Sequence, residues 1–173
     1  MLAQLETRNL LIQGIVDSAG SPKKGADELG ISVSMLSRIK NMERTLADDL
    51  KKKASAMSFK SALMIIKEVT GYDKLFSFFT KDRHPQNLIR RAKIEDVDSD
   101  RAFERIADRL TDKPADEDLT VEDIAYIQQE ACEIAEGIEA KINALVGLAE
   151  RYPRLKLEKM FTEKENICNK NGG

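Results

Sequence analysis

The stretch GADELGISVSMLSRIKN, residues 25–41, contains two short helical patterns separated by Gly30. Its apolar residues stand where two crossing helices share a core, and they are Ala26, Leu29, Ile31, Leu36 and Ile39. A helix-turn-helix requires a small residue at the crossing and a residue that tolerates positive φ in the turn. The stretch therefore predicts either a helix-turn-helix that reads DNA or a helical corner of some other all-α protein.

The second helix of this stretch carries short polar side chains and one guanidinium between its apolar residues. Such side chains can contact base edges in the major groove, and an arginine can bind guanine O6 and N7 with two hydrogen bonds. The residues predicted to read bases are Ser32, Ser34, Ser37, Arg38 and Asn41. The flanking cations predicted to contact DNA phosphates are Lys23, Lys24, Lys40 and Arg44.

Gly25 does not fit this pattern, because the first helix of the motif normally buries an aliphatic residue there. Glycine weakens a helix by about 1 kcal/mol relative to alanine. We therefore expect packing of this helix against its neighbours to compensate.

The net charge of −2 conceals an asymmetry between the two halves of the 173-residue chain. Residues 1–93 hold 17 Lys and Arg against 10 Asp and Glu, a net charge of +7. Residues 94–173 hold 11 against 20, a net charge of −9. A basic half that contains the motif and an acidic half that follows it indicate two different tasks.

The basic half is predicted to fold as a DNA-binding domain of about five helices over residues 1–80. One helix covers residues 3–17, and Ser21 with Pro22 begins the next. After a polar stretch that holds three lysines, Ser58 begins a further helix that Gly71 ends. A short helix is then expected to carry three of the four phenylalanines that close this core, Phe59, Phe76, Phe78 and Phe79.

Residues 81–98 are polar and contain Pro85, so they are predicted to be a linker. Ser99 is expected to begin a helix that ends near Leu110. A long helix follows, with Thr120 and Asp123 as a capping box at its start and Pro153 at its end. The sequence thus predicts a helical hairpin over residues 99–153 and a flexible tail over residues 154–173.

The long helix has an apolar stripe that repeats at spacings of three and four residues. The stripe can fold back on the helix before it, pair with another subunit, or do both. We favour self-association as a dimer or tetramer, because duplication lets a helix-turn-helix read adjacent half-sites. The predicted oligomer interface comprises Ile124, Ile127, Ala131, Ile134, Ile138, Ile142 and Leu145.

Nothing in the sequence indicates an enzyme, a metal site or a cofactor. The DVDSD run at residues 96–100 lacks the glycine and glutamate of a calcium loop, and His84 is the only histidine. No apolar run is long enough to cross a membrane. The first residues lack a basic segment and an unbroken apolar segment, so we expect no secretory signal. Cys132 and Cys168 have no metal or redox spacing, so we expect reduced thiols in a cytoplasmic protein.

The order of these elements resembles the CII-type transcriptional regulators of temperate bacteriophages. The resemblance rests on KKGADELGISVSMLSRIKN, on the following MSFKSALMIIKEVTGYDKL with its TGYDK stop, and on the acidic LTVEDIAYIQQEACEIAEGIEAKINALVGL. It implies an oligomeric, sequence-specific regulator of the lysis–lysogeny decision that binds double-stranded DNA, with RNA polymerase or another host protein as a further partner. Gly25 and the long segment 42–57 depart from the family pattern.

A second hypothesis is that the chain is a protein-interaction module. The acidic hairpin would then bind a basic host factor, and the helix-turn-helix would serve only as a scaffold.

Overall fold

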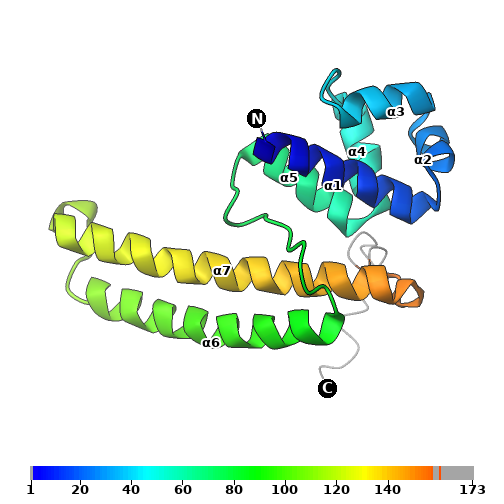
Figure 1. Cartoon of the computed structure of the whole chain (residues 1–173). Coiled ribbons are helices and arrows are strands. Elements are labelled where there is room, and N and C mark those ends of the chain that lie inside the picture. Colours follow the sequence, from blue (N-terminus) through cyan, green and yellow to red (C-terminus); the bar gives the residue numbers. More distant parts are fainter. Residues whose placement is uncertain (1, 158–159, 161–173) are drawn as a thin grey trace. The chain divides into compact units, whose positions relative to one another are not determined.

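The computed structural model describes residues 2–157 and 160, and within them the chain is entirely helical. The chain divides into two compact units. The first comprises Met1–Gly71 together with Leu148–Gly173, and the second comprises Tyr72–Gly147. The described residues form seven α-helices and two short 3-10 helices and contain no strand, as an all-α sequence predicts (Figure 1).

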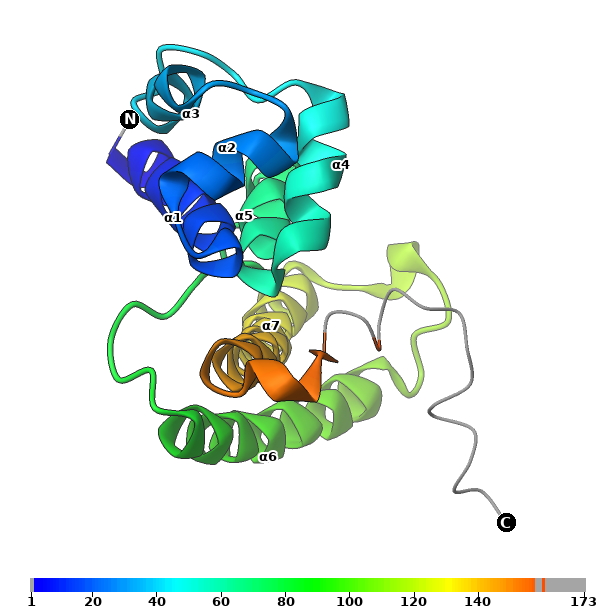
Figure 2. The same cartoon turned by 90° about the vertical axis from the view of Figure 1, so that its right-hand side faces the viewer.

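Five helices form the N-terminal part of the first unit, and both α1 and α4 pack against α5 (Figure 2). Their bounds are α1 (Leu2–Ala19), α2 (Pro22–Leu29), α3 (Val33–Lys40), α4 (Asp48–Met57) and α5 (Phe59–Thr70). The core that they enclose is aliphatic, and its fully buried members include Leu11, Ile15, Leu29, Ile39, Leu46 and Met64.

The local signals predicted to begin and end α2 and α5 are confirmed. The Ser21 hydroxyl accepts a hydrogen bond from the Lys24 amide at 3.2 Å, and the Ser58 hydroxyl accepts one from the Ser61 amide at 3.1 Å. Gly30 ends α2 with φ of 74°, in the left-handed region that a Cβ disfavours. Each signal depends only on neighbours in the sequence, which is why sequence reasoning finds it.

Gly25 lies buried where α2 approaches α1. A Cβ built at Gly25 would lie 3.0 Å from Cγ2 of Ile15, which is tight for a real side chain. The missing side chain therefore lets the two helices pack closely, and this contact is the compensation that the sequence required but could not locate.

One helix was missed in the N-terminal unit, because residues 48–57 were expected to be a polar stretch and instead form α4. The signal was present in the sequence. Leu50, Ala54 and Met57 follow one another at spacings of four and three, which places them on one face of α4, and Leu46 lies just before the helix. Ala54 is fully buried, and the lysines of this segment occupy the other faces.

The prediction of a short helix around residues 75–79 is wrong. Three of the phenylalanines predicted to close the N-terminal core, Phe76, Phe78 and Phe79, lie in the second unit. Residues 71–84 contain no helix in the structure. The buried amide of Asn143 fixes this segment by accepting from the Phe79 N–H at 2.9 Å and donating to the Ser77 carbonyl at 2.9 Å. The partner lies more than sixty residues away, so local sequence patterns could not reveal it.

The second unit is dominated by α6 (Pro85–Leu110) and by most of α7 (Val121–Arg151), two long helices that lie side by side and antiparallel (Figure 1). The predicted linker 81–98 is wrong from Pro85 onward, and so is the helix start at Ser99. Proline breaks the interior of a helix, but Pro85 occupies the first turn of α6, where its missing N–H costs nothing. Ser99 is instead buried in the middle of α6.

The predicted capping box of α7 is confirmed. The Asp123 amide donates to the Thr120 hydroxyl at 3.1 Å, and the Thr120 amide donates to the Asp123 carboxylate at 3.0 Å. Helix α7 ends at Arg151 before Pro153, as expected, and a 3-10 turn covers Pro153–Leu155. Most of the predicted flexible tail, residues 158–159 and 161–173, lies outside the described residues.

Small residues and ion pairs join α6 to α7. Gly137 faces Ser99 so closely that a Cβ built on the glycine would lie 2.9 Å from the Ser99 Cβ. Arg105 donates two hydrogen bonds to Glu130, at 2.8 and 2.5 Å, and Glu130 is buried. Polar contacts therefore set the alignment of these helices.

Asp123 is the most enclosed charge in this unit, with 2% of its side chain exposed. Its carboxylate pairs with Lys113 at 2.8 Å and also with Arg109. Hydrogen bonds from Lys113, then from the amide and hydroxyl of Thr120, and finally from Arg109 hold the pKa of Asp123 well below its ordinary value. The carboxylate is therefore ionised at neutral pH.

Candidate nucleic-acid interface

Helices α2 and α3 are joined by three residues, Gly30 to Ser32. The Gly30 amide donates to the Asp27 carbonyl and the Ile31 amide donates to the Ala26 carbonyl, each at 3.0 Å. This pair of hydrogen bonds with positive φ between them is a Schellman motif. It ends α2 sharply and turns the chain directly into α3.

The predicted base-reading residues in and beside α3 do not all lie on the same face of the helix. Ser34, Arg38 and Asn41 are exposed and follow one another at spacings of four and three, so they line one outward face. Leu36 and Ile39 are buried on the opposite side. The structure therefore provides a narrow polar face of three residues for contact with a partner.

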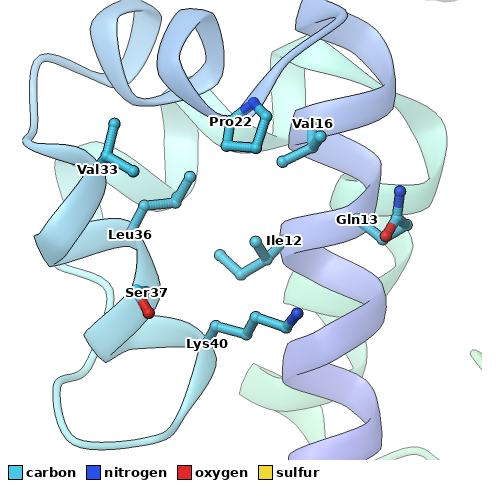
Figure 3. Close-up of a pocket in the computed structure, with 8 residues that line it drawn as sticks. All are labelled: Ile12, Gln13, Val16, Pro22, Val33, Leu36, Ser37 and Lys40. Carbon is cyan, nitrogen blue, oxygen red and sulfur yellow. The ribbon is translucent and has the colours of Figure 1, made fainter.

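Ser32 and Ser37 lie beside that face. The Ser32 hydroxyl accepts a hydrogen bond from the Met35 amide at 3.1 Å and caps α3. Ser37 instead lines a hollow of about 320 Å³ between α1 and α3 (Figure 3). Ser32 thus has a structural role of its own, and Ser37 stands on the flank of the helix.

The four residues predicted to contact phosphates are all exposed, but they lie at different places relative to α3. Lys23 and Lys24 occupy the first turn of α2, and Arg44 follows α3. Lys40 lines the same hollow as Ser37, and its side chain extends toward α1 (Figure 3). Lys40 therefore lies with Ser37 on the flank of α3 rather than on the outward face.

Sequence reasoning missed one charged residue at this face. The Glu43 carboxylate lies 3.4 Å from Nε of Arg38, and about half of each side chain is exposed. The signal that could have found it is positional, since Glu43 follows Arg38 by five residues across the end of the helix. Arg38 therefore presents its guanidinium beside an acidic partner.

The predicted oligomer stripe on α7 lies at the surface of the single chain. Ile124, Ile138 and Leu145 are 40 to 42% exposed, and the other members are half-buried or exposed. The buried positions of α7 are different ones and include Asp123, Glu130, Gly137 and Ala140. Packing against α6 therefore leaves the outer part of the stripe exposed to solvent in the single chain.

No family model, curated protein or solved structure matches the chain. Across residues 2–157 and 160, no group of three His, Cys, Asp or Glu side chains is arranged to hold a metal ion. No helix in that same part combines the length and the apolar character that crossing a membrane requires. The function must therefore be argued from the geometry of α2, α3 and α7.

Proposed function

We propose that this chain is a sequence-specific double-stranded DNA-binding transcriptional regulator. The observation that supports it best is the α2–turn–α3 arrangement, in which a sharp Schellman turn leads into a helix that exposes Ser34, Arg38 and Asn41. Helix-turn-helix proteins place such a helix in the major groove. Base contacts by this face would give specificity, and the nearby cations would give affinity through phosphates.

Self-association through the exposed stripe of α7 is part of the proposal. A helix of only eight residues reads few base pairs, so a dimer that binds two half-sites gains both affinity and specificity. An isoleucine-rich stripe at helical spacing is suited to pairing with a second copy. The resemblance to the CII-type regulators extends the proposal to the lysis–lysogeny decision of a phage or prophage.

Binding to random duplex DNA at several salt concentrations tests the proposal. Neutralising about four phosphates per protomer gives a slope of log K against log salt of about −3.6 per protomer. Replacing Lys23 with Gln should make the slope less steep by about 1. The matched control is Lys93→Gln, an exposed lysine of α6 that leaves the slope unchanged.

Absence of binding at low salt would overturn this function. The exposed apolar stripe and the acidic second half of the chain would then favour the protein-interaction module. A basic partner protein, rather than DNA, would be the ligand to seek.

A further inference from the structure

The end of α3 brings Arg38 and Glu43 together through its backbone. Met42 adopts φ of 62°, its amide donates to the Ile39 carbonyl at 3.1 Å, and the Glu43 amide donates to the Arg38 carbonyl at 2.9 Å. These are the two hydrogen bonds of a Schellman motif, which places the residue after the left-handed one beside the helical residue five positions earlier. The meeting of Glu43 with Arg38 is therefore built into the cap.

The cap at the end of α2 has the same hydrogen bonds but different side chains. There the two residues brought together are Ala26 and Ile31, both apolar, as is usual for this motif. In α3 an exposed ion pair replaces the apolar pair. Exposed ion pairs contribute little to stability, so the fold alone does not account for this one.

The atom that Glu43 approaches is informative. The closest approach of the carboxylate is to Nε of Arg38, the guanidinium nitrogen nearest the main chain, rather than to the Nη groups at the outer end of the side chain. Two N–H groups of a guanidinium are what guanine O6 and N7 accept in the major groove. An arginine held through Nε also loses less side-chain freedom on binding than one that moves freely.

We propose that Glu43 is a positioning residue that orients Arg38 for the recognition of guanine. This inference rests on the proposed function, because it assigns a base preference and a supporting residue to the same DNA-reading face. Arg38 touches the base, and Glu43 acts through Arg38.

The carboxylate of Glu43 also carries a negative charge next to a surface that approaches phosphates. Removing that charge should strengthen binding to DNA of any sequence, while removing the contact should weaken the preference for guanine. Glu43→Ala therefore changes the two quantities in opposite directions. A residue needed only for folding would lower both.

The experiment selects bound sequences from a random duplex library with the full chain and compares base preferences among variants. The wild type should enrich a guanine at one position of each half-site, and Arg38→Ala should lower that preference by about tenfold. Glu43→Ala should lower it by about two- to tenfold, the contribution of one ordered side chain. Glu43→Gln, which keeps the size of the side chain and a polar oxygen beside Nε but loses the charge, should retain an intermediate preference.

Glu28→Ala is the matched control, since Glu28 is an exposed acid of α2. It should strengthen binding to random DNA as Glu43→Ala does and leave the guanine preference unchanged. An unchanged preference in Glu43→Ala would overturn the positioning role while leaving DNA binding established. A wild-type chain that binds DNA but shows no guanine preference that depends on Arg38 would overturn it as well. A chain that binds no DNA would overturn the proposed function itself.

Discussion

The two units of this chain bury different kinds of side chain. The largest fully buried side chains of α1–α5 are mainly leucines, isoleucines and a methionine, whereas those of the second unit are Val146, Asn143 and Asp123. Buried apolar groups stabilise a fold directly, while buried charges and amides mostly define which arrangement forms. The comparison teaches that α1–α5 contain the chain's main stabilising core, and that the α6–α7 pair is aligned by polar contacts with apolar surface left outside.

The largest effect should come from removing a core side chain of the first unit. Leu29→Ala deletes a side chain that is fully buried between α2 and its neighbours. Changes of this kind lower the free energy of unfolding by about 2–5 kcal/mol. Urea unfolding followed by circular dichroism measures the change.

Val121→Ala is the comparison variant in the second unit, because Val121 is 84% exposed on α7. It should alter the free energy of unfolding by less than about 0.5 kcal/mol. Similar effects of the two substitutions would contradict the assignment of Leu29 to a stabilising core.

The next effect concerns the apolar stripe of α7. A charge at Ile138, which is 42% exposed, would be buried without a partner if a second copy packs on the stripe. Light scattering of the full chain should therefore show a dimer or tetramer for the wild type and a smaller mass for Ile138→Asp. Gln129→Asp, at an exposed position of the same helix outside the stripe, should keep the wild-type mass. A monomeric wild type would show that the stripe does not pair copies of this chain.

A smaller effect is expected from the charge that anchors the start of α7. Because the pKa of Asp123 is lowered in the folded chain, its ion pairs stabilise the fold above the unfolded-state pKa of about 3.9. That contribution is lost as the pH falls toward the folded-state pKa. Asp123→Asn should therefore be less stable than the wild type at pH 7, and the difference should shrink below about pH 4.

Urea unfolding at a series of pH values between 7 and 3 measures this difference. Asp112→Asn serves as the control, since Asp112 is exposed in the same connection between α6 and α7. It should follow the wild-type curve throughout. A constant difference between wild type and Asp123→Asn at all pH values would mean that the carboxylate's ionisation does not contribute.

What could be predicted from the sequence was mostly local. Ser21, Ser58 and the Thr120–Asp123 pair begin helices by bonding to amides three residues away, so their roles can be read directly. The position of residues 76–79 depends on Asn143, and the use of Gly25 depends on Ile15 across a helix crossing. These contacts belong to the tertiary structure and have no pattern in the neighbouring sequence.

The candidate site shows the same division. The outward residues of α3 followed from helical periodicity, and their exposure agrees with it. The Arg38–Glu43 contact did not follow, because it requires a methionine in a left-handed conformation that glycine normally adopts. Propensity alone argues against a Schellman turn at Met42, and the turn is what creates the pair.

The smallest expected effect comes from Met42 itself. A non-glycine residue in the left-handed region costs about 1–2 kcal/mol, and glycine offsets part of this by its greater freedom in the unfolded chain, about 0.5–1 kcal/mol. Met42→Gly should therefore raise the free energy of unfolding by about 0.5–1 kcal/mol while preserving the cap. Lys52→Gly, in the exposed middle of α4, should lower it by about 1 kcal/mol because glycine disfavours a regular helix. Urea unfolding measures both changes. Glycine should stabilise the left-handed position and destabilise the helical one, so the two changes in the free energy of unfolding should have opposite signs. Changes of the same sign would mean that Met42 is not strained in the way its φ indicates.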